Sequence, residues 1–330
     1  MSYSKRQFER QMEEGWRSIG GDVCAECFTD YAIKEFIRNK ATENECSYCA
    51  RASETPIAAD MDEVLSFIGQ GFKREYDIPE NCLPYESAEG GWQIIDPDDS
   101  AEVFADLNIC TEDCADLFND LVSAFSDRQF VARRPLILSP ADGLKYSWET
   151  FCHVTKHETR FVLFSHKAKL PPKDHLVHPD DRWVEYAAPY QILLELDGMV
   201  KSHGLVKTVP KGTHLVRARQ HLASDSHTTA SDLGSPPKEL ARQSRMSPAG
   251  IPMFYGAADE TTAFVETFAP TTTKKDAVTF ATFAATRTLT LLNLVDLPAV
   301  PSIFEEDRFY ERQPLIFLRD FQRDVSEPVK

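Results

Sequence analysis

Apolar side chains recur at intervals of three and four residues along residues 4–204, and this spacing is typical of amphipathic helices. The first pattern covers residues 4–17, where Phe8, Met12 and Trp16 fall on one face. The same spacing predicts helices at about 31–37, 60–68, 99–107, 111–125, 145–160 and 188–203. A stretch rich in Pro, Gly and acidic residues, 77–99, is expected to be a long loop. Residues 58–204 are therefore expected to form a helical region.

The pattern changes after Gly204, where short runs of β-branched and aromatic residues predict strands. A strand is expected at 213–219, and two further strands, joined by a turn near Thr286, are expected at 278–282 and 289–292. A short aromatic strand, 253–255, should lead into a helix after Asp259, and a last helix is expected at 308–325. The sequence thus predicts an α+β chain, with a helical first part and a mixed α/β domain at its end.

Composition and charge narrow the classes of function. The chain has 330 residues and a formal net charge of −16, so it repels phosphate backbones, and no nucleic-acid partner is expected. There is no Lys or Arg from Tyr76 to Asp127. No apolar run approaches the roughly 18 residues that span a bilayer, so no membrane partner is expected. Because the N-terminus lacks the apolar core of a secretory signal, we expect a cytoplasmic protein.

Four of the eight cysteines form two C-x-x-C pairs, namely Cys24 with Cys27 and Cys46 with Cys49. Each pair can turn two sulfurs toward one point, and two pairs complete the tetrahedral shell that Zn²⁺ prefers. Four protein ligands leave no open position for a substrate, so the predicted zinc is structural. An iron–sulfur site and redox thiols are the alternatives.

The stretch from Arg245 to Glu266 places an arginine, the aromatic ring of Tyr255 and a carboxylate on one loop–strand–helix unit. Upstream, Arg217 stands in an apolar strand, where a guanidinium requires an anionic partner because burying it unpaired is costly. Its planar fork matches phosphate geometry. A substrate with a phosphate, a flat ring and a bond that breaks to give a cation, such as NAD, suits this trio. Ordinary surface charges, an internal salt bridge and a core ring are the alternatives.

These segments together resemble a known family. The sequence VRAR at 216–219, RMSPAGIPMFYG at 245–256 and AFVE at 263–266 is similar to the RES domain. The resemblance implies a fold similar to ADP-ribosyltransferases over 205–330, and a toxin of a toxin–antitoxin pair that consumes NAD. The N-terminal part, with its C-x-x-C pairs and helices, resembles the HEPN-like region fused to some RES domains.

The resemblance also implies roles for individual residues. Arg217 would hold the pyrophosphate of NAD, and Arg245 would help to clamp the phosphates. Tyr255 would stack near the nicotinamide. Glu266 would stabilise the oxocarbenium-like ribose that forms when nicotinamide leaves, and this role agrees with the chemistry of a carboxylate placed beside a developing cation.

The chain departs from the family pattern at its C-terminal end. The family serine lies on a late strand, whereas here a helix is followed by the last residues, so we expect the domain to be C-terminally incomplete. Ser302 and Ser326 do not stand in a matching context, and neither is assigned. An inactive interaction module is therefore an alternative function.

A second alternative is a HEPN-type RNase, in which an Arg and a His lie a few residues apart on a helix. Arg160 and His166 are six residues apart, which does not place them on one helix face. His175 and His178 are expected to be loop residues.

The sequence therefore predicts three parts, namely a four-cysteine zinc knuckle at 1–57, a HEPN-like region at 58–204 and a RES domain at 205–330. The predicted function is cleavage of the nicotinamide–ribose bond by hydrolysis, phosphorolysis or ADP-ribosyl transfer. The expected partners are NAD as substrate, structural zinc, a cognate antitoxin and a second copy of the chain.

Overall fold

The computed structural model describes residues 14–126, 128–135, 137–157, 191–241, 249–267 and 275–326. They divide into two units, described separately below. The N-terminal unit holds the residues up to 150 together with 299–316, and the C-terminal unit holds the rest. Helices and small antiparallel sheets confirm the expected α+β class. The boundaries expected at residues 57 and 204 stay predictions.

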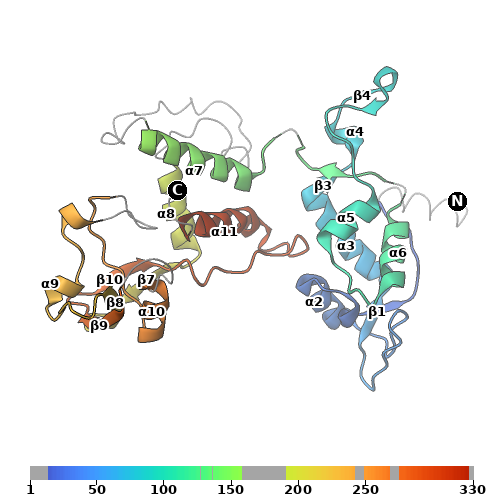
Figure 1. The fold of residues 1–330 in the computed structure, drawn as a ribbon. Coiled ribbons are helices and arrows are strands. Elements are labelled where there is room, and N and C mark those ends of the chain that lie inside the picture. Colours follow the sequence, from blue (N-terminus) through green and yellow to red (C-terminus); the bar gives the residue numbers. More distant parts are fainter. Residues whose placement is uncertain are drawn as a thin grey trace, which may run out of the picture. The chain divides into compact units, whose positions relative to one another are not determined.

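The N-terminal unit is built around a small sheet and several helices (Figure 1). Strands β1 (Asp22–Cys24) and β2 (Ala58–Asp60) pair antiparallel. Two more strand pairs, β3 with β6 and β4 with β5, are two residues long in each strand. The other elements are η1 (Ala25–Cys27), α2 (Tyr31–Lys40), α3 (Met61–Glu75), β3 (Tyr76–Asp77), α4 (Pro79–Cys82), β4 (Tyr85–Glu86), η2 (Ser87–Glu89), β5 (Gly91–Trp92), α5 (Ser100–Leu107), α6 (Ala115–Ala124), β6 (Val131–Ala132) and most of α7 (Pro140–His157).

Aspartates start three of these helices. The side chains of Asp30, Asp60 and Asp99 each accept two hydrogen bonds from backbone N–H groups at the start of α2, α3 and α5. Asp99 also forms a capping box, in which the carboxylate of Glu102 accepts from the N–H of Asp99 at 2.9 Å. These bonds satisfy N–H groups that have no partner within the helix.

Most predicted helices are present. Those expected at 31–37, 60–68, 99–107, 111–125, 145–160, 188–203 and 308–325 correspond to α2, α3, α5, α6, α7, α8 and α11. The expected loop at 77–99 contains the short helix α4 and the β4–β5 pair. The helix expected at 4–17 lies outside the described residues except for its end. None of the helices in the described parts of the chain combines the length and apolar character needed to cross a bilayer.

The core of the N-terminal unit includes a segment from near the end of the chain. Phe304 is 2% exposed and joins the same cluster as Val23, Ile33 and Leu65. A Cβ on Gly71 would lie 2.2 Å from a ring carbon of Phe304, so the ring lies directly against the backbone of α3. Residues 299–316 therefore contribute to the N-terminal core.

Polar contacts fix the same segment. The hydroxyl of Tyr31 accepts from the N–H of Ser302 at 3.0 Å and donates to Glu305. Arg74 forms an ion pair with Glu306 at 2.7 Å, and its other terminal nitrogen donates to the carbonyl of Ile303. A second ion pair joins Arg312 to Glu75 at 3.0 Å.

The C-terminal unit contains four strands that form two antiparallel pairs, together called the ribbon. Strand β8 (His214–His221) pairs along its whole length with β9 (Ala277–Ala284), and β7 (Val206–Val209) pairs with β10 (Leu289–Leu292). The other elements are α8 (Gln191–Ser202), α9 (Ala230–Leu233), η4 (Lys238–Leu240), α10 (Glu260–Thr267) and most of α11 (Arg312–Ser326), while η5 (Phe309–Glu311) belongs to the N-terminal unit.

Strands β9 and β10 are joined by a turn near Thr286, as expected. Each pairs with an earlier strand, and between the two strand pairs Ala285 exchanges hydrogen bonds with Gly212 and Thr213. One expectation for this unit is wrong. Residues 253–255 do not form a strand, and only Ala257 exchanges two hydrogen bonds with Val216.

Candidate functional sites in the two units

The four patterned cysteines meet at one point of the N-terminal unit. Cys24 ends β1, Cys27 ends η1, and Cys46 and Cys49 come from the turn before β2. Three Sγ–Sγ distances are 3.5–3.7 Å, and all four sulfurs lie within 4.8 Å of one another. A tetrahedron of sulfurs at about 2.3 Å from zinc has edges of about 3.8 Å. The geometry therefore fits a metal ion.

The thiols of the cluster differ in how readily they lose a proton. Burial, followed by a hydrogen bond to Cys49, raises the pKa of Cys24 to about 11, and burial raises the pKa of Cys27 as well. Burial alone would also raise the pKa of Cys46, but backbone N–H groups, including that of Cys24 at 3.3 Å, together lower it to about 7. A metal ion would replace the protons of the buried thiols.

A fifth cysteine lies against this cluster, and the sequence analysis did not identify it. After burial, a hydrogen bond with Cys114 is the next cause that raises the pKa of Cys27. Cys114 is the residue before α6, and Cys110 forms a bridge with Phe28 next to Cys27. The spacing of Cys110 and Cys114 alone does not indicate this neighbourhood, since it arises from pairing between segments that are distant in the sequence.

In the C-terminal unit, Arg217 lies in the middle of β8 between the buried Val216 and Ala218. Its Nη1 atom is buried and has no hydrogen-bond partner among the described residues. Burial, followed by the charge of Arg219, lowers the pKa of Arg217. A guanidinium with a buried, unpaired nitrogen is costly to keep, so this position favours an anionic ligand.

An aromatic loop, residues 251–257, lies beside Arg217. The guanidinium carbon of Arg217 is 5.4 Å from the centre of the Phe254 ring, a cation–π geometry. Phe254 also meets Phe283 edge to face at 5.0 Å. Tyr255 is 42% exposed and lies close enough to Arg217 to raise the pKa of its guanidinium, against the effect of burial. A cation and accessible rings are thus brought together.

Glu266 lies on helix α10, which packs against the other face of β8. Ala263 of α10 is 4% exposed and forms a cluster with Val216 and Ala218. Because side chains alternate along a strand, Arg217 projects from the opposite face. The structure therefore brings Arg217 and Tyr255 together, and it places the exposed Glu266 on a helix of the other face.

Other predicted site residues lie outside the described residues. Arg245 falls in the gap at 242–248, and both Arg160 and His166 fall in the gap at 158–190. His175 and His178 fall in the same gap.

Comparison with known families gave two matches. Residues 39–169 match the family model of HEPN/RES N-terminal domain 1, and residues 214–316 match that of the RES domain. The resemblance found in the sequence is confirmed. Arg217, the aromatic loop and α10 all fall within the RES match, and so does the segment around Phe304. Searches of curated proteins and of solved structures gave no match.

Proposed function

We propose that this chain, which joins a HEPN/RES N-terminal domain to a RES domain, consumes NAD by cleaving its nicotinamide–ribose bond. At family level a RES domain is an NAD-related module associated with toxin–antitoxin systems. The observation that carries the proposal is Arg217, whose buried Nη1 has no partner among the described residues and whose guanidinium lies over Phe254. A pyrophosphate would supply the missing partner.

The rings of the aromatic loop suit the rest of the substrate. Phe254 and Tyr255 are both more than one third exposed, so a flat ring can stack on them without unfolding the loop. In the proposed arrangement Arg217 holds the phosphates, Arg245 assists it, and Tyr255 contacts the nicotinamide. Each of these roles stays a proposal.

The proposed reaction breaks one bond. The electron pair of the nicotinamide–ribose bond leaves with the nicotinamide nitrogen, which neutralises the ring's positive charge. The ribose carbon becomes oxocarbenium-like, and Glu266 would stabilise it before water, phosphate or a protein side chain donates the new oxygen. Since α10 packs on the face opposite Arg217, Glu266 could act only if the substrate extends around the edge of β8.

The test measures nicotinamide release and NAD binding on the same set of full-length variants. We expect nicotinamide release by the unchanged chain, at least about 100-fold weaker NAD binding by Arg217→Ala, and loss of release with retained binding in Glu266→Gln. Lys207→Ala, an exposed change on β7, is the matched control. No release and no binding by the unchanged chain would contradict the proposal.

Binding without release would instead support an inactive interaction module, and the opposite-face position of α10 is the observation that favours this second candidate. In that case Glu266→Gln would not alter any measured property, whereas Arg217→Ala would still abolish binding. A cognate antitoxin and a homo-oligomer remain proposed partners, and structural zinc remains the proposed metal at the four cysteines.

A further inference from the structure

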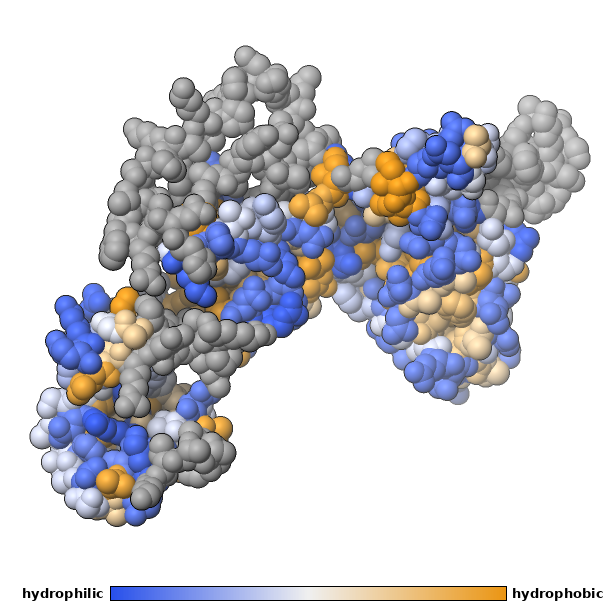
Figure 2. Space-filling model, turned by 45° about the horizontal axis from the view of Figure 1, so that its top comes forward, coloured by the Kyte–Doolittle hydropathy of each residue, from blue (hydrophilic) through white to orange (hydrophobic). Residues whose placement is uncertain are grey.

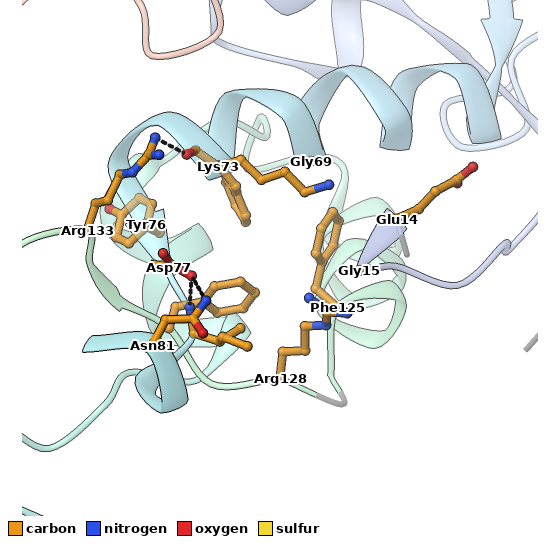
Figure 3. A pocket seen from close by; sticks show the side chains of 13 residues that line it. Glu14, Gly15, Gly69, Lys73, Tyr76, Asp77, Asn81, Phe125, Arg128 and Arg133 are labelled. Atoms are coloured by element: carbon orange, nitrogen blue, oxygen red, sulfur yellow. Dashed lines mark hydrogen bonds between the residues drawn. The ribbon is translucent and has the colours of Figure 1, made fainter. Parts of the chain in front are cut away.

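A cavity lies in the N-terminal unit, apart from the cysteine cluster. It has a volume of about 350 Å³ and is bounded by the C-terminal half of α3, the end of α6 and the residues next to β3 and β6 (Figure 3). This volume is at the lower end of the range for small-molecule sites. No function proposed above uses this cavity.

Cations surround the cavity in an otherwise acidic part of the chain. Lys73, Arg128 and Arg133 line it, opposed by the carboxylates of Glu14 and Asp77. Figure 3 shows these side chains on different sides of one opening. The chain as a whole carries a net charge of −16, so a site with more cations than carboxylates is a local exception. Such a site attracts a small anion.

Two of the cations, Lys73 and Arg133, come from the end of α3 and from the residue after β6. Arg133 donates through Nη1 to the backbone carbonyl of Lys73 at 2.9 Å, which fixes both residues at the end of α3. The Lys73 ammonium and the other guanidinium nitrogens of Arg133 have no partner within the described parts of the chain. The Oδ1 of Asp77 accepts from the N–H of Ile78 and the amide of Asn81, both at 2.8 Å, so this oxygen is turned toward neutral donors.

The remaining wall of the cavity is apolar. Phe72, Phe125 and Phe130 form its inner side, and the half-buried Tyr76 and Ile78 lie nearer the opening. Bare phosphate would satisfy the two cations but leave this wall in contact with water. A ligand that joins an anionic group to a flat ring satisfies both.

We propose that this cavity binds a nucleoside monophosphate, with the phosphate attracted by the cations that line the opening and the base against Tyr76 and the phenylalanine wall. The site would belong to the N-terminal unit and would be separate from the NAD site proposed at Arg217. It does not depend on that proposal.

The test is calorimetry of the full-length chain with AMP, adenosine and inorganic phosphate. We expect AMP to bind more tightly than either fragment, and Lys73→Ala or Arg133→Gln to weaken AMP binding at least about tenfold. Lys40→Ala, an exposed change on α2, is the matched control and should have no effect. The Arg217→Ala chain should bind AMP as before, which separates this site from the RES site.

Several outcomes would overturn the proposal. These are no AMP binding, equal affinity for AMP and phosphate, or AMP binding that is lost only in Arg217→Ala. Unchanged zinc content and melting temperature of the Lys73→Ala and Arg133→Gln chains would show that lost binding does not come from unfolding.

Discussion

The two units differ in how completely their strands are buried by side chains. In the N-terminal unit Val23 and Cys24 of β1 are buried, and the core cluster collects residues as distant in sequence as Trp16 and Phe304. In the C-terminal unit the cluster beneath β8 consists of small side chains from β8 and α10, and apolar residues of β9 and β10 are exposed. Figure 2 shows hydrophobic residues among polar ones at the surface. One region is thus closed by packing, whereas the other keeps aromatic rings accessible beside a half-buried cation.

The difference indicates how the two regions divide their tasks. The closed core contains four thiols that could hold a metal ion, and it includes part of the segment that matches the RES domain. The ribbon keeps accessible rings and a guanidinium nitrogen without a hydrogen-bond partner among the described residues, an arrangement that is costly for stability. The following changes test this comparison, from the largest expected effect to the smallest.

Cys27→Ser should have the largest effect. It removes one of four sulfurs from the cluster, and structural zinc typically contributes about 10 kcal/mol or more to the folding of small metal-binding domains. We expect loss of bound zinc and unfolding of the N-terminal unit, measured by metal analysis and thermal unfolding. Cys152→Ser, at an exposed position, is the control. Retention of one zinc per chain would show that Cys27 is not a ligand.

Phe304→Ala should destabilise the N-terminal unit by about 3–5 kcal/mol, because it empties a fully packed aromatic site. Denaturant unfolding of the N-terminal unit measures the change. Tyr310→Ala lies in the same segment but is 76% exposed, and it should cost less than about 0.5 kcal/mol. Equal effects of the two changes would mean that the segment does not belong to the core in solution.

Substitution of one helix glycine in each unit compares how tightly the two units are packed. Gly71→Ala in α3 should cost about 1–3 kcal/mol, since its Cβ would collide with Phe304 at 2.2 Å. Gly198→Ala in α8 meets no atom within 4 Å and should stabilise the chain by about 0.5–1 kcal/mol. Thermal unfolding of both variants measures the two changes in stability. If both changes had the same sign, the difference in packing would be contradicted.

Arg217→Met should have the smallest effect on stability. Whether it raises or lowers the free energy of unfolding shows whether Arg217 has a structural partner. Replacing a guanidinium that has a buried, unpaired nitrogen by an apolar side chain should be neutral or stabilise the ligand-free chain by about 1 kcal/mol. The same change should remove any rise in melting temperature that NAD causes. Strong destabilisation without NAD would show that Arg217 has a structural partner instead.

Local features of the sequence predicted much of the fold. The helices follow from apolar spacing, and the cap at Asp99 follows from its position before an apolar run. The two C-x-x-C pairs predicted the cysteine cluster, because a fixed spacing brings two sulfurs to one point whatever lies around them.

Long-range pairing could not be predicted in the same way. The sequence predicted β9 and β10 as two strands joined by a turn, but it did not indicate that β10 pairs with β7 and β9 with β8, since the partners depend on where the opposite strands turn. The sequence did not indicate that Phe304 packs against the distant helix α3, because a single apolar residue in a loop can pack against many different parts of a protein.

For the proposed NAD site, the sequence alone determined the residue types, namely the strand arginine, the aromatic loop and the glutamate of the next helix. The tertiary structure decided which of them share a face. Alternation along β8 sends Arg217 toward Phe254 and sends Val216 and Ala218 toward α10, so Glu266 and Arg217 start from opposite sides of one strand. Periodicity fixes which residues alternate, but only the packing of the loop and the helix fixes which face each one covers.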